Sequence, residues 1–336
     1  MNQEADTWPR AVAAGWHPLA HTHELKGKPL ARTLMGIPVV LFRSTGNAAA
    51  LLDRCPHRNV PLSQGSVCDG FLVCGYHGWR FNATGRCVHV PGAEVVPEIA
   101  ARPMHVREEA GLVWVSLAAE PADFPVLPLE LQSPNLDRFW WSLPSSHARL
   151  LDAVENLLDP AHPHCLHPNL VRRTNQRRLV HVRFRSDEYG GEARYKEEDT
   201  RMAFLPRLFE KQRLTAVARY QAPTIAQLVF ENDTGLALAI TVIFSPEAQD
   251  RTRPFAHFST SRGILPAWAK RGLLICFHTL VLRQDRVALA AQAQNIERFG
   301  GPEFELGPLD LFGPLIWRLA NGRSTEPQER ELHFWL

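Results

Sequence analysis

The 336-residue sequence contains few cysteines and almost no net charge. Six cysteines are too few for a disulfide-dense scaffold, and in a reducing compartment sparse cysteines serve as metal ligands or free thiols. The 37 basic residues nearly balance the 35 acidic ones, so a net charge of +2 gives no field that would attract nucleic acid or an anionic membrane. We therefore expect neither of these as a main partner.

Long hydrophobic runs are also missing. The longest, from Gly272 to Leu282, has about 11 residues, whereas a membrane-spanning helix needs roughly 20. The N-terminal residues MNQEADTWPR contain acids and lack the basic start and apolar core of a signal peptide. The sequence thus predicts a cytoplasmic protein with no membrane span. No G-x-G-x-x-G motif for a dinucleotide appears either, so oxidation of NAD(P)H would fall to a separate protein.

Turn residues divide the first third of the chain into short β-like runs. The 45% hydrophobic and 21% charged shares are ordinary for a globular protein, and the length predicts about two domains. A Pro-rich stretch from Pro121 to Pro134 cannot continue a central strand or a helix, so we expect a linker there. The first domain is predicted at residues 1–120, with strands at Ala31–Met35, Val39–Arg43, Phe71–Cys74, Arg86–Val90 and Leu112–Leu117.

The second predicted domain, residues 121–336, mixes helical and β patterns and is expected to be α+β. Leu150–Asp159 reads as a helix that a following proline ends. Alternation between Val180 and Thr260 suits an antiparallel sheet, with a hairpin turn at Gly190-Gly191. Helical patterns return after Pro266.

Two loops of the first domain each offer one thiol and one imidazole. They are Cys55-Pro56-His57 and Cys74-Gly75-Tyr76-His77. A [2Fe–2S] centre held by two cysteines on one iron and two histidines on the other needs such a split, while a zinc ion on the same four residues is the alternative. The other two cysteines of this domain, Cys68 and Cys87, match neither loop and are expected to be small buried residues.

A second constellation lies at the end of the helix predicted in the second domain. Asp159 and His162 can share one helix face, whereas His167 lies about 140° further round an ideal helix. The helix must therefore bend or end if both histidines are to reach one ion, and nearby prolines allow this. Two imidazoles and one carboxylate form the facial triad of non-haem Fe(II) sites. Taken alone, however, this histidine-rich segment is more typical of a polar surface loop than of an iron site.

The loops CPHRNVPLSQG and CGYHGWRF resemble the two cluster-binding loops of Rieske non-haem iron oxygenases, and the second constellation resembles the N-x-x-D-x-x-H-x4-H stretch of the same family. The resemblance implies that the cluster ligands are Cys55, His57, Cys74 and His77. It implies that the iron ligands in this stretch are His162 and His167. Asp159 then links the two metal centres, and Asn156 is a polar group beside the iron. His164 is an extra histidine that the family pattern does not use.

The third iron ligand must be a carboxylate well downstream. In this family it is usually an Asp near the start of a C-terminal helix, and the segment from Gln284 to Gln292 resembles that pattern. The resemblance therefore implies Asp285, with Asp310 as runner-up. The opposing interpretation is that Asp285 sits at a helix N-terminus only because the macrodipole favours it there.

The whole chain is similar to short Rieske monooxygenases of the vanillate demethylase-like and pheophorbide a oxygenase-like kind. The resemblance implies a Rieske β domain followed by a helix-grip-like catalytic domain, in which helices wrap an antiparallel sheet around the iron. It implies a [2Fe–2S] cluster and a mononuclear Fe(II), with O2 as co-substrate. The implied activity is hydroxylation or oxidative demethylation of an organic, cyclic or aromatic substrate, of the monooxygenase type.

The resemblance also implies a homotrimer and a separate ferredoxin or flavin reductase. A rival interpretation is a Rieske electron carrier without oxygenase activity, which would need only the first 120 or so residues. A basic run from Arg172 to Arg185 could receive an acidic redox partner, or it could be a solvated face paired with nearby acids.

Overall fold

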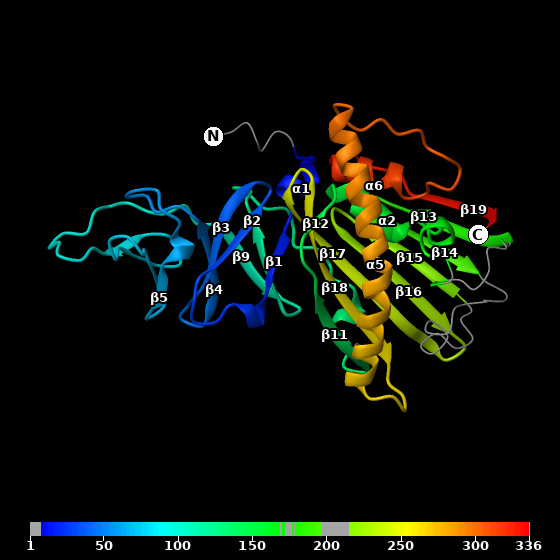
Figure 1. Cartoon of the computed structure of the whole chain (residues 1–336), viewed down its shortest axis with the longest axis horizontal. Helices are drawn as coiled ribbons and strands as arrows, with labels where there is room; N and C mark the ends of the chain where they lie inside the picture. The colour runs from blue at the N-terminus through cyan, green and yellow to red at the C-terminus, as the bar shows by residue number, and fades with distance from the viewer. Residues whose placement is uncertain (1–7, 169, 172–176, 178, 197–214, 336) are drawn as a thin grey trace. The chain divides into compact units, whose positions relative to one another are not determined.

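The computed structural model describes residues 8–168, 170–171, 177, 179–196 and 215–335. The chain divides into two compact units (Figure 1). The first contains residues 13–125, Trp8 and the short segment 245–248, and the second contains residues 9–12, 126–244 and 249–336. The domain limit near residue 120 was predicted from proline content alone, and it stays a prediction.

The first unit is built from short antiparallel strands. One sheet has the order β1-β10-β9, a second the order β2-β3-β4 and a third the order β5-β6-β7-β8. The strands are β1 His17–His21, β2 Leu30–Leu34, β3 Ile37–Ser44, β4 Asn47–Leu52, β5 Ser66–Cys68, β6 Phe71–Val73, β7 Arg80–Phe81, β8 Cys87–His89, β9 His105–Glu109 and β10 Leu112–Ser116. Side chains from β3, β4, β6 and β7 meet in one core that includes Val40, Phe42, Leu51, Leu72 and Phe81.

The second unit is a nine-stranded sheet with helices, which confirms the α+β class. Eight strands follow the order β11-β18-β17-β16-β15-β14-β13-β19, and β12 pairs with β18. The strands are β11 Leu136–Ser142, β12 Ser146–His147, β13 Leu179–Ser186, β14 Gly190–Lys196, β15 Thr215–Gln221, β16 Ile225–Asn232, β17 Gly235–Ala248, β18 Arg251–Ser261 and β19 Gln328–Trp335. The helices are α1 Arg10–Ala14, α2 Leu150–Leu158, α3 Pro163–Leu166, α5 Ala267–Arg298 and α6 Gly313–Ala320. Strand β19 is an element that the sequence patterns did not predict.

Two helices of the second unit position its polar centre. Helix α2 buries Leu150, Ala153, Val154 and Leu158, which recur at helical spacing, and it packs on β15, β16 and β18. Helix α5 packs against β11 and β12. The buried ammonium of Lys270, in its first turn, donates to Asp137 Oδ2 at 2.6 Å and to the Ser261 carbonyl at 2.7 Å. These two bonds anchor the start of α5 to the neighbouring strands.

The hairpin between β13 and β14 differs from its prediction. Gly190 and Gly191 are the first residues of β14 rather than the turn. The bend lies at residues 187–189, where Asp187 Oδ1 accepts the backbone N–H of Tyr189 at 2.8 Å and of Gly190 at 3.0 Å. The glycine at 190 is needed because a Cβ there would collide with the Tyr220 carbonyl on β15. An Asp side chain therefore makes the turn, and Gly190 makes room for the next strand.

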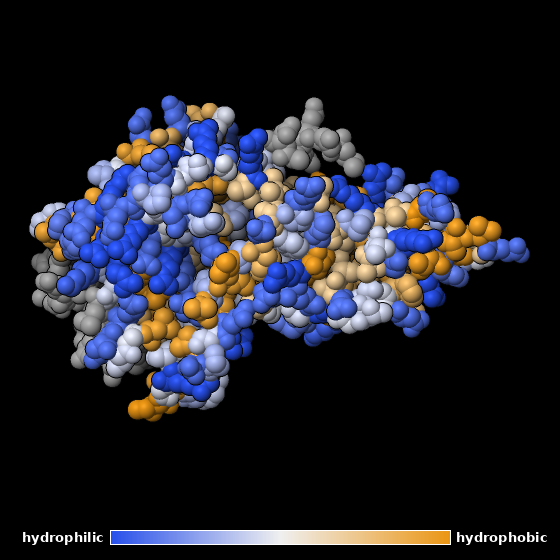
Figure 2. Space-filling model, turned by 180° about the vertical axis from the view of Figure 1, so that it is seen from behind, coloured by the Kyte–Doolittle hydropathy of each residue, from blue (hydrophilic) through white to orange (hydrophobic). Residues whose placement is uncertain are grey.

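In the view from behind, hydrophilic residues dominate and the hydrophobic ones form separate groups (Figure 2). Within the described residues, we find no helix that is both long enough and apolar enough to cross a membrane.

Two glycines of the first unit allow a matched test of its packing. Gly85 and Gly92 both have φ +77°, but a Cβ at Gly85 would collide with the Ala101 carbonyl, whereas Gly92 has open space. Gly92→Ala should cost about 1–2 kcal/mol for the left-handed backbone alone. Gly85→Ala should cost about 1–3 kcal/mol more, because neighbouring backbone must shift. Urea unfolding of both variants measures the difference; equal losses would contradict the packing at Gly85.

Candidate functional site

The two cysteine–histidine loops of the first unit have the same backbone plan. The N–H of Cys55 donates to the Val60 carbonyl, and the N–H of Cys74 donates to the Trp79 carbonyl, both at 2.8 Å. The residue four places after each cysteine returns an N–H to the cysteine carbonyl, from Asn59 in one loop and Gly78 in the other. Both of these residues have positive φ, of 61° and 72°. The loops are therefore two copies of one ligand-presenting turn.

Each loop places its thiol inside and its imidazole outside. Cys55 and Cys74 are 1% and 2% exposed and belong to the core of the unit, whereas His77 is exposed and His57 is partly exposed. The rings of His57 and His77 lie 4.8 Å apart between centroids. Burial raises the pKa of the Cys55 thiol, and the adjacent Cys74 thiol contributes to this rise.

This separation of the two ligand types fits a two-iron cluster. A [2Fe–2S] cluster needs thiolates around one iron and imidazoles around the other. Across the described ranges, the four residues do not form a set compact enough for one ion, which counts against the zinc alternative. Of the two remaining cysteines, Cys87 is buried as expected, but Cys68 is exposed and donates its S–H to Asp69, so the prediction for Cys68 was wrong.

In the second unit, helix α2 ends at Leu158, just before the proline that was expected to end it. Asp159 is its C-cap, and the Asp159 carboxylate accepts the N–H groups of Ala161 at 2.7 Å and His162 at 3.3 Å. Pro163 then starts the single turn α3, with His162 and His167 as its flanking residues. Helix α2 thus ends before His162, and His167 leaves the helical conformation at the end of α3, so the two histidines do not lie on one ideal helix.

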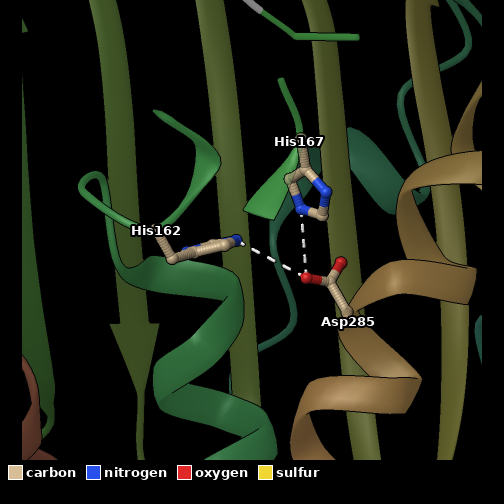
Figure 3. A group of neighbouring side chains, drawn as sticks. All are labelled: His162, His167 and Asp285. Atoms are coloured by element: carbon tan, nitrogen blue, oxygen red, sulfur yellow. Dashed lines mark ion pairs between the residues drawn. The ribbon is translucent and has the colours of Figure 1, made fainter. Parts of the chain in front are cut away.

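His162, His167 and Asp285 come together in one group (Figure 3). Asp285 Oδ1 lies 3.1 Å from His167 Nε2 and 3.6 Å from His162 Nε2, and one ligand atom from each residue lies within 4.8 Å of the others. Metal–ligand bonds of about 2.1 Å place neighbouring ligand atoms about 3 Å apart. Among the residues that can be described, this is the one set of His, Cys, Asp or Glu gathered closely enough to hold an ion.

The environment of these residues favours a bound cation. His167 is 1% exposed, and its Nε2 has no hydrogen-bond partner among the described residues although the Asp285 carboxylate faces it. Burial alone lowers the pKa of His167, but the adjacent Asp285 carboxylate and the contact with Gln284 outweigh burial and raise the pKa above the ordinary value. The site therefore attracts positive charge between the imidazole and the carboxylate, and a metal ion supplies it.

Asp285 itself lies in the middle of α5, not near the start of a helix as predicted. The helix begins at Ala267, so its macrodipole does not explain an acid at this position. Asn156 on α2 donates its amide N–H to Asp285 Oδ1 at 3.3 Å. Gln284, the residue before Asp285, accepts from His167 Nδ1 at 2.7 Å. The sequence pattern included Gln284, but we gave it no role, because its partner lies 117 positions away.

Asp159 lies on the other side of His162. Its Oδ2 is 3.4 Å from His162 Nδ1. Burial raises the pKa of Asp159, but hydrogen bonds from His162 and Ala161 outweigh it, and the net pKa is lowered. The buried Tyr195 on β14 lies close enough that the Asp159 charge adds to the rise of its pKa, which burial mainly causes. Asp159 is thus an ionised contact of His162.

Other candidates fall outside this group. His164 is not part of the ion-sized set, and Asp310 is exposed in a loop, where it accepts the Gly307 N–H. Of the basic run, Arg172, Arg173 and Arg178 lie outside the described residues. Arg183 and Arg185 pair with Glu331 and Glu329 on β19, as in a solvated face.

Comparisons with known proteins agree with this geometry. A family model for the Rieske [2Fe-2S] domain matches residues 15–100, and one for the vanillate O-demethylase oxygenase C-terminal domain matches residues 146–308. The chain belongs to the Rieske oxygenases. The cofactors that go with these two domains are a [2Fe–2S] cluster and a mononuclear iron, with O2 as co-substrate.

Several named proteins are similar to this chain in sequence. A putative toluene-4-sulfonate monooxygenase system iron-sulfur subunit from Comamonas testosteroni is 37% identical over 171 residues, which is 46% of each chain. The oxygenase component of dicamba O-demethylase from Stenotrophomonas maltophilia is 35% identical over 164 residues, 46% of this chain and 48% of that protein. The chain thus spans just under half the length of the relatives it matches in sequence.

Solved structures resemble the fold over a longer stretch. Dicamba monooxygenase bound to dicamba has a TM-score of 0.79 at 24% identity and covers 92% of this chain and 97% of its own. NdmA of Pseudomonas putida CBB5 with caffeine has a TM-score of 0.77 at 20% identity, covering 95% and 90%. Such identities establish the shared fold alone.

The acidic face of α2 allows a test by pH. Burial, and then the charges of Asp310, Asp152 and Asp159, raise the pKa of Glu155 from 4.5 to about 7. Because the folded-state pKa is the higher one, the buried charge lowers stability as pH rises from 4.5 to about 7, and the loss is complete above that. Glu155→Gln should therefore raise the free energy of unfolding above neutral pH by about 1–3 kcal/mol, after a discount for partial exposure.

Urea unfolding of Glu155→Gln and wild type at alkaline and mildly acidic pH measures this gain. The gain should shrink toward pH 4.5, where Glu155 is neutral in both states. Glu303→Gln, on an exposed loop residue, is the control and should change stability little at either pH. A gain that does not depend on pH would contradict the raised pKa.

Proposed function

We propose that this chain is the oxygenase component of a Rieske non-haem iron system, of the monooxygenase type. The observation that carries the proposal is the group of His162, His167 and Asp285, which brings three ligand atoms within 4.8 Å of one another in the same chain as the two cluster loops. A facial set of two imidazoles and one carboxylate leaves positions open on Fe(II) for O2 and substrate. An electron carrier would need no such set.

The two units would hold the two metal centres. We assign the cluster to Cys55, His57, Cys74 and His77, and the iron to His162, His167 and Asp285. When bound, the cluster supplies single electrons and the iron supplies a site for O2 chemistry. This chain's own groups hold the ligands: Asn156 orients the Asp285 carboxylate, and the core around Cys55 and Cys74 keeps water from the thiolates.

Asp159 is proposed as the link between the centres. Its contact with His162 Nδ1 is one half of the bridge. The other half would be His77 in a neighbouring copy of the chain, in the homotrimer that the family resemblance implies. A carboxylate on an imidazole N–H fixes the tautomer and raises the basicity of the ligand. Asp159 would therefore tie an iron ligand of one copy to a cluster ligand of the next.

The substrate and partners are proposed at the level of class. We infer a small organic substrate, cyclic or aromatic, that is hydroxylated or oxidatively demethylated. Relatives named for toluene-4-sulfonate and dicamba, and a structure containing caffeine, support this class. A separate ferredoxin or flavin reductase would bring the electrons. All six cysteines are free, in line with a cytoplasmic location.

Replacement of the third ligand tests the proposal. Asp285→Ala should keep the visible absorbance of the cluster but lower the iron content from about three to about two atoms per chain, because only the mononuclear iron is lost. Substrate-dependent NADH oxidation with a surrogate reductase, measured across a small panel of aromatic and alicyclic compounds, should disappear. Asp310→Ala is the control and should retain both iron and activity. Full iron retention in Asp285→Ala would place the ligand elsewhere.

Replacement of Asp159 separates the bridge from the ligands. Asp159→Asn keeps an oxygen that can accept the Ala161 N–H, so the turn after α2 and both metal centres should remain. Coupled turnover should nearly vanish, because the negative charge that Asp159 places beside the His162 imidazole is lost. Single-turnover oxidation of the prereduced cluster, with Asp152→Asn as a control on the same helix, measures the effect. Oxidation at the wild-type rate would show that Asp159 has no bridging role.

A further inference from the structure

His167 is held between two consecutive residues of α5. Its Nδ1 lies 2.7 Å from Gln284 Oε1, and its Nε2 lies 3.1 Å from Asp285 Oδ1. Consecutive positions on a helix point about 100° apart, so one helix reaches both nitrogens of a ring that belongs to another segment. The ring is 1% exposed, so bulk water does not compete for either nitrogen.

The two contacts determine which nitrogen of the His167 ring carries the proton. A carbonyl oxygen only accepts hydrogen bonds, so the proton of a neutral imidazole lies on Nδ1, toward Gln284. The lone pair then lies on Nε2 and faces the Asp285 carboxylate, which also only accepts. Two acceptors at this distance repel unless a cation lies between them. By accepting the hydrogen bond from Nδ1, Gln284 thus leaves the lone pair of His167 Nε2 available to a metal ion.

The other histidine of the group has a different partner. His162 Nδ1 faces the Asp159 carboxylate at 3.4 Å, whereas His167 Nδ1 faces a neutral amide. A carboxylate partner makes an imidazole a stronger electron donor than an amide does. The group therefore pairs one strongly donating imidazole with one weaker one, and the amide adds no further negative charge beside Asp285.

We propose that Gln284 is a positioning residue of the iron centre: its amide oxygen fixes the tautomer and direction of His167, and its neutrality keeps that ligand a modest donor. The inference rests on the proposed function, because it takes Fe(II) as the ion that His167 binds. The Gln284 side chain has two separate properties, an oxygen that accepts a hydrogen bond and the absence of charge. Different substitutions can remove each of them.

Two variants of Gln284 test these properties. Gln284→Leu has a similar size but no acceptor, so His167 loses its partner, and the Kd for Fe(II) should rise about 10–100-fold. Gln284→Glu keeps the acceptor and adds charge, so it should restore Fe(II) binding and lower the reduction potential of the mononuclear iron. Gln294→Leu, an exposed position on the same helix, is the matched control and should behave as wild type.

Fe(II) binding is followed by competition with a chelator, and the potential by redox titration of the EPR signal of the nitric oxide adduct. The visible absorbance of the cluster reports that each variant is folded. Wild-type affinity in Gln284→Leu, or no rescue and an unchanged potential in Gln284→Glu, overturns the inference. If Gln284→Leu does not fold, the potential of Gln284→Glu still decides. A wild-type protein that binds no Fe(II) at His162 and His167 would instead refute the proposed function.

Discussion

The close approach of the Asp285 carboxylate to two imidazoles is the constraint on which the second unit depends. Burying a carboxylate and a fully enclosed imidazole is costly unless each polar atom has a partner. Asn156, Gln284 and Asp159 supply those partners from α2, α5 and the turn that follows α2. The end of α2, the proline start of α3 and the anchoring of α5 all serve to bring these groups within hydrogen-bond distance.

The two candidate centres are built in different ways. The cysteine–histidine loops are local: each is closed by hydrogen bonds between residues four or five places apart, and the core of a small β unit holds both thiols. The three-residue group is non-local, since two ligands come from the segment around α3 and the third from the middle of a 32-residue helix. A local loop carries its own geometry, whereas the second group exists only when the whole unit is folded.

This difference explains what the sequence could predict. Spacing alone predicted Cys55, His57, Cys74 and His77 as one set, because ligands on short loops leave a readable pattern. Asp285 was reached only through family resemblance, and its place in mid-helix was not foreseen. Gln284 belongs to the same sequence pattern, but its role could not be predicted, since its partner is distant in sequence. The exposure of Cys68, the turn at Asp187 and strand β19 depend on tertiary contacts that no local pattern records.

An ion held by this group would also cross-link two distant segments of the polypeptide. The ligands His167 and Asp285 are 118 positions apart, and a cross-link that closes a loop of about 100 residues removes up to about 4–5 kcal/mol of chain entropy from the unfolded state. None of the cluster ligands spans such a distance, so loading of the first unit gives no comparable restraint to the second. Protein prepared without ferrous ion would then keep the colour of its cluster while the second unit had lost this cross-link.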